Sequence, residues 1–564
     1  MTAFEDFRSE CMGLLKKAVK NPELEKPPKE IPADLAFPTF ALAKEQKRNP
    51  VEIARDVAEK ISKKKAKKSL ITRIEAAGPY VNFFADWSVL SSEVINEVLT
   101  KQNKYGKKST KKETIMIESP GPNTNKPLHV GHLRNAALGQ ALANILEHAG
   151  YRVVRVDIVN DRGVHICKSM LAYKKFGNNK QPDKKSDHFV GDFYVLYAQQ
   201  EKEHPELEDE TQQMLVAWEQ KNKDVFKLWK QMNEWALSGL KQTYDRFGIR
   251  IDKAYFESDH YLKGKELILA GLKKKLFAKD EKGNIIVDLD ANGLGKKILL
   301  RADGTAIYMT QDIAVAKIRF NDYHMNRMIY VVGSEQKHHF QVLFKVFEML
   351  KFPFAKKAYH LAYGMVFLPE GKMKSREGKV VDADTLMDEV TTLARHEIQS
   401  RSVMIDRDEL QKRAEQIGIG AIKYFLLKFE PSKDFVYDPE KSISFDGDSG
   451  PYMQYTHARA CSILRKATKH KKKTASALND PLEITVVKKV AAFPESITKA
   501  ADEYKPSIVA TSVTDLAASF NELYHAKQFI GAKNEAALLA LTESVAVTLR
   551  VGLKLLGIDA PEKM

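Results

Sequence analysis

Two histidines separated by a Val-Gly pair are the residues of this chain best suited to chemistry. His129, Gly131 and His132 lie where an apolar stretch, residues 114–117, gives way to a helical pattern. The amides at a helix N-terminus attract phosphate, neutral imidazoles can hydrogen-bond phosphate oxygens, and a glycine lets a ligand approach the backbone closely. The turn therefore predicts a nucleotide site, although two surface histidines beside a helix start would give the same pattern.

A second group of charged residues lies much later in the chain. Lys372, Lys374 and Arg376 stand between two glycines, just past a predicted strand. A cationic loop of this kind can stabilise the charge that develops on pyrophosphate when a triphosphate is cleaved. A basic surface turn is the commoner origin of such a run, so the interpretation depends on its partnership with the histidine turn.

Both groups need a rigid scaffold, and the hydrophobic pattern predicts a parallel sheet. The strand-like residues 114–117, an amphipathic run that Gly150 ends, and the β-rich residues 152–159 form one strand–helix–strand unit. Residues 328–368 repeat this order. Because strand and helix alternate, we expect a sheet covered by helices.

The length of the chain, 564 residues, allows three or four domains, and its composition divides it into three parts. Residues 1–105 combine a Pro-rich segment, a helical run and a strand pair, which predicts a small α+β domain. Residues 106–395 hold the parallel sheet, with a polar helical insertion near 168–242. Residues 396–564 have almost no strand signal and are predicted to form a helical bundle. The predicted fold class is therefore multidomain α/β.

The net charge and the cysteine content restrict the possible binding partners and the cellular compartment. Lys and Arg number 90 against 74 Asp and Glu, a net charge of +16, which suits a polyanion such as nucleic acid, although a solvated surface would also show it. Three cysteines without a CxxC pattern indicate neither a disulfide framework nor a zinc site. The N-terminus does not read as a secretory signal, and no membrane span is expected. These features favour a cytoplasmic protein.

Several ordered blocks carry a resemblance to a known family. The histidine block and the later lysine run are similar to the paired signatures of class I aminoacyl-tRNA synthetases, and the chain resembles the arginyl-tRNA synthetases over nearly its whole length. The resemblance implies a Rossmann-like catalytic domain, an N-terminal α+β domain that contacts tRNA, and a C-terminal all-α anticodon-binding bundle. The blocks are AAGPYVNFF (76–84), ESPGPNTNKPLHVGH (118–132), RADGTAIYMTQDIA (301–314), YVVGSEQKHHF (330–340), GKMKSREGKVVDADTLMDE (371–389), DSGPYMQYTHARACSIL (448–464) and LLGIDAPEKM (555–564).

The resemblance also implies a two-step reaction. ATP activates L-arginine to arginyl-adenylate with release of diphosphate, and the 3′ end of tRNA(Arg) then takes the arginine, releasing AMP. Positioning and charge stabilisation carry such catalysis, so no protein nucleophile is needed. In this family, activation is expected to require tRNA. Magnesium is expected to accompany ATP, but no ligand cluster in the sequence locates a metal site.

An arginine pocket follows from the same resemblance. Recognition of a forked guanidinium needs a planar carboxylate and a flat surface beside it. Tyr308 and Asp312 are four residues apart and could share a helix face. Asp312 is expected to pair with the guanidinium, Tyr308 to contact it, and Glu118 to supply a second carboxylate. Asn123 and Gln336 are expected at the α-amino and carboxylate end, while an acid near a helix start and a core tyrosine are the ordinary alternatives for Asp312 and Tyr308.

The expected ATP contacts lie on both signatures. The general class I pattern, Lys-Met-Ser-Lys-Ser, is changed here, as it commonly is in arginyl enzymes, so that Ser375 stands where the key lysine is normally found. Lys126, just before the histidine block, is expected to compensate. Catalytic or ATP-binding roles are therefore assigned to Pro122, Lys126, His129, Gly131, His132, Lys372, Met373 and Lys374.

For tRNA, the resemblance implies contacts in the first and last domains. Aromatic and arginine side chains suit splayed RNA bases, although the tyrosines could equally pack inside the bundle. No obvious dimerisation stripe is present, which favours a monomer. The predicted tRNA contacts are Asn82, Phe84, Tyr452, Gln454, Tyr455 and Arg459.

Two other classes of protein could also carry a histidine turn of this kind. A different nucleotidyltransferase with a His-x-Gly-His turn would be a single short domain without a bundle. A non-catalytic RNA-binding relative of a synthetase would be expected to lose signature or pocket residues. His129, His132, Lys372, Tyr308 and Asp312 are all present, which favours the enzyme.

Overall fold

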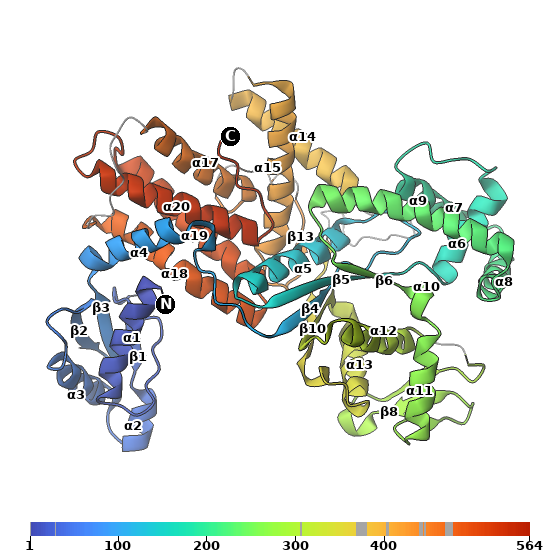
Figure 1. Cartoon of the computed structure of the whole chain (residues 1–564), viewed down its shortest axis with the longest axis horizontal. Coiled ribbons are helices and arrows are strands. Elements are labelled where there is room, and N and C mark those ends of the chain that lie inside the picture. Colours follow the sequence, from blue (N-terminus) through green and yellow to red (C-terminus); the bar gives the residue numbers. More distant parts are fainter. Residues whose placement is uncertain are drawn as a thin grey trace.

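Three bodies make up the molecule: an N-terminal domain, a central domain built on a parallel sheet, and a C-terminal helical bundle (Figure 1). The N-terminal domain and the bundle share one side of the view, and the sheet with its inserted helices occupies the other. The structure is a computed structural model. It describes residues 2–28, 30–304, 307–367, 381–401, 405–438, 441, 444, 447–467 and 478–564.

The N-terminal domain is the predicted α+β unit. Its three-stranded antiparallel sheet has the order β1-β3-β2, and the hairpin between β2 and β3 turns at Gly78, which has a positive φ of 55°. Phe7, Val81 and Phe83 are fully buried in its core. The elements are α1 (Ala3–Lys16), β1 (Leu35–Pro38), α2 (Phe40–Gln46), α3 (Pro50–Ser62), β2 (Ile71–Ala77) and β3 (Tyr80–Ala85).

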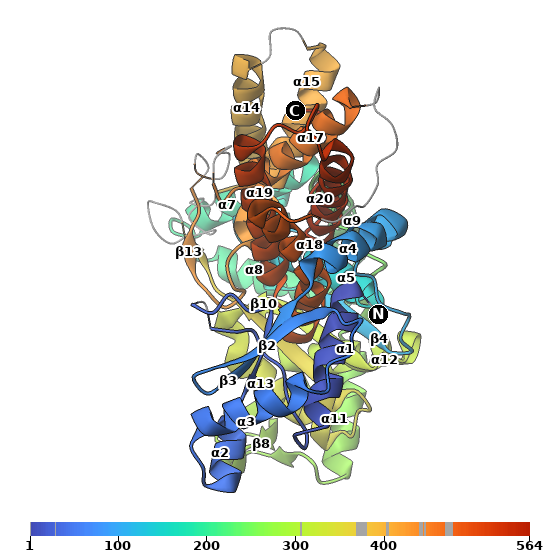
Figure 2. The same cartoon turned by 90° about the vertical axis from the view of Figure 1, so that its left-hand side faces the viewer.

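A linking helix, α4 (Trp87–Lys101), joins this domain to the rest of the molecule. It is followed by a short 3-10 turn, η1 (Gln102–Lys104), and packs against helices of the C-terminal bundle (Figure 2). Tyr105 is buried at this junction, where its hydroxyl donates a hydrogen bond of 2.9 Å to the carbonyl of Val490. The first and last domains therefore touch each other directly.

The central sheet is parallel throughout, with the strand order β11-β10-β4-β5-β6. The chain begins in the middle at β4, moves outward to β5 and β6, and then returns to the other side of β4. Ligands of such sheets bind beyond the carboxyl ends of the strands at the point where this direction changes, here between β4 and β10. The strands are β4 (Thr114–Glu118), β5 (Arg152–Val159), β6 (Lys253–Phe256), β10 (Arg327–Gly333) and β11 (Ala358–Tyr363).

Helix α5 (Val130–His148) follows β4 and begins at the histidine turn. It approaches the sheet closely, because a Cβ at Gly139 would lie 2.1 Å from Ser119 Oγ. The helix ends just before Gly150, which has a φ of 93° and confirms the predicted end. The turn is thus fixed between a buried strand and a buried helix.

A helical insertion and a small antiparallel sheet extend the central domain. The insertion, predicted near 168–242, contains α6 to α9 and has its own core, which includes several aromatic side chains. The small sheet, with order β7-β8-β9, was not predicted from the sequence. The elements are α6 (Val164–Phe176), α7 (Ser186–Gln200), α8 (Leu207–Glu219), α9 (Lys223–Phe247), α10 (Glu257–His260), α11 (Lys263–Lys273), β7 (Ala278–Lys279), β8 (Ile285–Asp288), η2 (Asp290–Asn292), β9 (Lys296–Leu300), α12 (Tyr308–Tyr323), η3 (Ser334–Gln336), α13 (Lys337–Met349) and η4 (Ala355–Lys357).

The C-terminal part is helical, and its first helices connect it to the sheet. The boundary predicted at 395 falls inside α14, so the helical region begins before that residue. Among the described helices, α20 alone is long and apolar enough to cross a membrane, and 83% of that stretch is buried in the bundle, as in a core helix. The elements are β12 (Val366–Phe367), α14 (Ala383–Arg401), α15 (Arg407–Leu427), β13 (Phe435–Val436), α17 (Gly450–Lys466), α18 (Pro481–Glu503), α19 (Pro506–Ala526) and α20 (Glu535–Leu555).

Candidate active site and nucleic-acid interface

The histidine turn is held by hydrogen bonds between its own side chains and backbone. His129 is the N-cap of α5, with an extended backbone, and its Nδ1 accepts a hydrogen bond of 3.2 Å from the amide of Gly131. His132 Nδ1 accepts the amide of His129 at 3.1 Å. The two rings have centroids 3.8 Å apart. Two imidazoles thus form the reciprocal cap that Ser and Glu usually provide, so their orientation is set by the helix start.

Both rings are neutral at pH 7 and present a donor. Each Nδ1 accepts a main-chain amide, so the proton of each neutral ring lies on Nε2. Burial, and then the charge of Lys126, lower the pKa of His129 to about 4. Burial, His129 and Lys126 hold the pKa of His132 well below its ordinary value. The arrangement can therefore donate two hydrogen bonds to phosphate oxygens beside a helix N-terminus.

The predicted arginine-recognition residues lie at the start of α12. The Tyr308 side chain is 70% exposed, which excludes a core tyrosine. Asp312 lies about one turn later, whereas the N-cap of the helix is Ile307. The Asp312 carboxylate is 39% exposed, and its Oδ2 lies 2.7 Å from His339 Nε2 on α13. The structure therefore offers an accessible carboxylate beside an accessible phenol ring.

Glu118, the predicted second carboxylate, already has a partner within the chain. It ends β4 and forms an ion pair with Arg319 of α12, whose side chain is 1% exposed. Burial raises the pKa of Glu118, and the charge of Arg319 opposes that effect. The pair ties the first strand to the helix that carries Asp312. Contact between Glu118 and a substrate stays a prediction, because a guanidinium of the protein occupies this carboxylate.

The residues predicted for the other end of the amino acid also lie beyond strand ends. Asn123 forms an isolated parallel bridge with Asn160, past the ends of β4 and β5. The carbonyl of Pro122 accepts the amide of Asn160 at 3.0 Å. Gln336 ends η3, directly after β10, and is exposed. Asn123 and Gln336 thus extend from neighbouring strands at the same edge of the sheet.

The lysines predicted to bind ATP are placed only in part. Lys126 is partly exposed in the loop before α5, and its charge lowers the pKa of both histidines, which puts its ammonium group near their rings. Lys372, Met373 and Lys374 lie outside the described residues, so their roles stay predictions.

Glu257 was not predicted, yet it lines a cavity together with Tyr308. The cavity has a volume of about 440 Å³, and Arg162 and Tyr261 form part of its wall. Glu257 directly follows β6, and burial raises its pKa to about 7. A bound cation would favour its charged form, so it is a candidate for the same guanidinium. The only sequence signal is a carboxylate after a strand, and β6 is too short for its pattern to reveal it.

One group among the described residues has the geometry of a metal site: Asp187, His188 and Asp384. Lys185 Nζ lies 2.8 Å from a carboxylate oxygen of both Asp187 and Asp384, and His188 Nε2 lies 2.9 Å from Asp384. The ammonium group already supplies the positive charge at the centre. The group is therefore an ion cluster that joins α7 to α14, and it does not fit magnesium.

The predicted tRNA contacts of the N-terminal domain differ in exposure. Asn82 has no exposed surface and lies on β3, the central strand of the sheet, where its side-chain amide donates to the carbonyl of Tyr80. This burial corrects the prediction that its side chain contacts RNA. Phe84 is partly exposed, and its ring centroid lies 3.8 Å from the guanidinium of Arg73. That pair could receive a base or a ribose.

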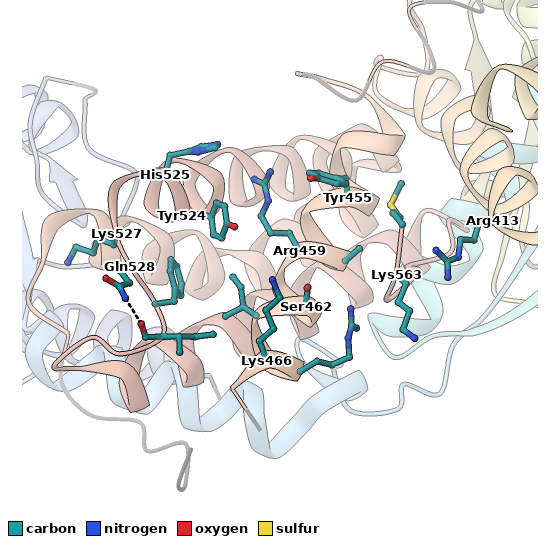
Figure 3. A pocket seen from close by; sticks show the side chains of 16 residues that line it. Arg413, Tyr455, Arg459, Ser462, Lys466, Tyr524, His525, Lys527, Gln528 and Lys563 are labelled. Carbon is teal, nitrogen blue, oxygen red and sulfur yellow. Dashed lines mark hydrogen bonds between the residues drawn. The ribbon is translucent and has the colours of Figure 1, made fainter. Parts of the chain in front are cut away.

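In the bundle, Tyr455 and Arg459 line a cavity of about 830 Å³ (Figure 3). The Arg459 guanidinium lies 4.8 Å from the Tyr455 ring and 4.6 Å from the Tyr524 ring, and it donates a hydrogen bond to Asn521. Aromatic planes next to a cation suit stacked RNA bases. Further basic residues of the lining are Arg413, Arg465, Lys466, Lys527 and Lys563.

The neighbouring predicted contacts belong to the bundle interior. Gln454 has no exposed surface, and its amide donates to the carbonyls of Gln416 at 3.1 Å and Asp559 at 2.9 Å. Tyr452 is partly buried against the main hydrophobic core. Successive helix residues point about 100° apart, so Gln454 faces α15 while Tyr455 faces the cavity, which corrects the prediction of an RNA contact for Gln454.

Three family models match consecutive parts of the chain. They are the arginyl tRNA synthetase N terminal domain over residues 3–85, the catalytic domain of tRNA synthetases class I (R) over residues 94–439, and the DALR anticodon binding domain over residues 453–564. The parallel sheet, the histidine turn at its switch point and the catalytic-domain match together define the class I aminoacyl-tRNA synthetases.

Relatives identify the branch of that class. The chain is 47% identical to the arginine–tRNA ligase of Treponema denticola, over 89% of this chain and 87% of that protein. It is 41% identical to that of Porphyromonas gingivalis, over 96% and 95%. The arginyl-tRNA synthetase structure of Thermus thermophilus covers all of both chains with a TM-score of 0.86 and 27% identity. The chain belongs to the arginyl-tRNA synthetase family.

Proposed function

We propose that this chain is an arginine–tRNA ligase, which activates L-arginine with ATP and transfers it to the 3′ end of tRNA(Arg). One observation carries the proposal: the two neutral histidines follow β4, and Glu118 at the end of that strand is paired to Arg319 on α12, the helix that presents Tyr308 and Asp312. Hydrogen-bond donors for phosphate oxygens and a carboxylate for a guanidinium are thereby brought to one edge of the sheet.

The geometry supports a role for each group. A carboxylate oxygen of arginine attacks the α-phosphorus of ATP, and the bond to the β,γ-diphosphate breaks. His129 and His132 donate to phosphate oxygens through Nε2, and Asp312 pairs with the guanidinium beside Tyr308. A terminal ribose hydroxyl of tRNA then attacks the carbonyl carbon of the adenylate, and AMP leaves. Correct positioning supplies most of the rate gain.

Three further points belong to the proposal. Magnesium enters with ATP, held by phosphate oxygens, so it is part of the substrate. The protein acts as a monomer. It acts in the cytoplasm, for which its three free cysteines, Cys11, Cys167 and Cys461, are suited because reducing compartments keep thiols unpaired.

ATP–diphosphate exchange, measured with each standard amino acid, tests the activity. Arginine is expected to support exchange, and only in the presence of tRNA(Arg). Lysine lacks the planar fork and citrulline lacks the charge, so a site built around a carboxylate should reject each by roughly 10³-fold or more. Comparable exchange with another amino acid contradicts the substrate, and exchange with none contradicts the activity.

The basic, aromatic cavity of the bundle supports a second part of the proposal, namely that bases of the tRNA anticodon bind there. Arg459 lies between two tyrosine rings, as Figure 3 shows, and could stack on an unpaired base while its charge attracts the backbone. The residues lie on α17 and α19, far from the histidine turn in the chain.

Replacing Arg459 by methionine is expected to weaken tRNA(Arg) binding roughly 5- to 150-fold, because a stacked base contact contributes about 1–3 kcal/mol. The measurement is a filter-binding titration at one fixed salt concentration. Lys489→Met is the matched control, since Lys489 is a cation on α18 that pairs with Asp515 outside the cavity. Equal effects of the two substitutions would show that only net charge matters.

A further inference from the structure

Arg134 is a fully buried cation outside the sites described so far. Arg134 belongs to α5, the helix that begins with the histidine turn, and its side chain has no exposed surface. Within the described part of the chain it forms no ion pair. Its guanidinium instead donates hydrogen bonds to four main-chain carbonyls: those of Gly364 at 2.5 Å, Met365 at 3.4 Å, Pro431 at 2.9 Å and Lys433 at 2.7 Å.

These carbonyls belong to two segments that run side by side. Gly364 and Met365 precede β12, which leads into the lysine-bearing residues 368–380. Pro431 and Lys433 follow α15, which packs against α17 of the bundle. The Gly364 amide donates to the Pro431 carbonyl at 2.9 Å, and β12 pairs with β13. Arg134 therefore joins the histidine helix, the strand before the lysines and the end of α15.

The chain after the lysine segment returns to the same helix start. The Val130 amide donates to the carbonyl of Val381 at 3.1 Å, and the amide of Ala383 donates to Leu128 at 3.0 Å. His129 and Asp382 form an antiparallel bridge. Both flanks of residues 368–380 are thus hydrogen-bonded to the stretch from 128 to 134.

Burying an arginine at this position costs the hydration free energy of its charged guanidinium. Burial lowers the pKa of Arg134 to about 10, so the group is still charged at pH 7; Tyr363 and the Asp434 carboxylate oppose this effect only in part, and neither forms an ion pair or hydrogen bond with the guanidinium among the described residues. Its planar fork reaches carbonyls of two segments at once, and its charge lies 4.5 Å from the ring of Phe435. An apolar side chain could fill the volume, but it could not hold two strands in register.

We propose that Arg134 is a positioning residue, which fixes the strand before the lysine segment and the end of α15 relative to the histidine turn. The inference rests on the proposed function, because the lysines matter only if this site cleaves ATP. Loss of the guanidinium would displace the flank of the segment. The effect would fall on the rate of adenylate formation, since the hydrogen bonds of Arg134 go to the main chain of residues 364, 365, 431 and 433, and Arg134 lines neither the cavity beside Tyr308 nor the cavity of the bundle.

Arg134→Met and Arg134→Lys test this role in the full-length protein. The methionine variant is expected to lower kcat of arginine-dependent exchange by roughly 10²-fold, the size of effect that a misplacement of about 1 Å produces, with KM for arginine within about 3-fold. The lysine variant should recover part of kcat, because it keeps the charge but loses the fork. Thermal unfolding is followed for each variant.

Arg155→Met is the matched control. Arg155 lies on β5 with a side chain 7% exposed, and it is held by Glu147 at 2.6 and 2.9 Å and by Asn144, away from both signatures. The substitution Arg155→Met should lower Tm and leave kcat unchanged. Wild-type kcat in Arg134→Met, or an equal loss in Arg155→Met, overturns the positioning role. If Arg134→Met does not fold, the test rests on Arg134→Lys, and a wild-type kcat in that variant overturns the positioning role.

The same experiment tests the proposed function separately from the inference about Arg134. A wild-type protein without arginine-dependent exchange overturns that function and the inference with it. If the wild-type protein catalyses arginine-dependent exchange and Arg134→Met does so at the same rate, only the inference about Arg134 is overturned.

Discussion

Asp312→Asn is expected to abolish arginine activation while the fold stays intact. The substitution keeps the shape of the side chain but removes the charge opposite the substrate guanidinium. Leaving one member of a desolvated ion pair without its partner costs about 3–5 kcal/mol, so kcat/KM for arginine should fall roughly 10²- to 10³-fold or more. Arginine-dependent ATP–diphosphate exchange with tRNA present measures the effect, and circular dichroism checks the fold.

Asp322→Asn provides a closely matched control. Asp322 lies on the same helix, its carboxylate is 35% exposed against 39% for Asp312, and it accepts a hydrogen bond of 2.7 Å from Tyr255. It should retain wild-type kcat/KM. Wild-type activation by Asp312→Asn would remove Asp312 from the pocket, and an equal loss in both variants would indicate a distorted helix instead.

His129→Asn should lower kcat of adenylate formation by roughly 10²- to 10³-fold, the usual effect of removing one donor that stabilises transition-state charge. Asparagine can still cap α5 through its side-chain oxygen, so the helix start is preserved while the Nε2 donor is lost. KM for arginine should change little, because the imidazole is assigned to phosphate. Pre-steady-state measurement of diphosphate release gives the rate directly.

The pH profile gives a second check on the histidines. Burial lowers the pKa of His129 to about 4, so the ring is neutral above that pH and charged only below it. Its protonation should therefore leave kcat constant between pH 5.5 and 8. An activity that rises through pH 6 to 7 in the wild type, but not in His129→Asn, would contradict a neutral donor.

His148→Asn is the control for both measurements. His148 lies at the other end of α5, its pKa is also lowered by burial, and its Nε2 lies 2.8 Å from the carbonyl of Tyr105. The substitution should affect thermal stability and leave kcat unchanged. A loss of kcat as large as that in His129→Asn would show that any damage to α5 disables the site.

The order of the elements could be predicted from the sequence, because the signals for it are local. Apolar runs at 114–117 and 152–159 became β4 and β5, and the run at 328–332 became β10. The helix between the first two strands ends where Gly150 adopts a positive φ. Periodicity and glycine act within a few residues of themselves, so they can be recognised without knowledge of the fold.

Which face of a helix is buried was less predictable. Tyr455 and Gln454 are adjacent, and both suit RNA by composition. Only the packing of α17 against α15 shows that Gln454 is enclosed and Tyr455 lines the cavity. The boundary at 395 failed to coincide with an element for a similar reason, because α14 continues without a break through the change in composition.

The sequence by itself thus determined the main strands of the parallel sheet, the helical regions, the histidine turn and, through its resemblance, the candidate pocket, but not the small sheet β7-β8-β9 or the short strand β6. Only the tertiary structure decided which side chains are the partners of the buried charged groups. Glu118 meets Arg319 across 201 residues of chain, and Arg134 meets Lys433 across 299. The physical reason is that the partner of a buried charge depends on strand order and helix packing, which bring distant segments together after local structure has already formed.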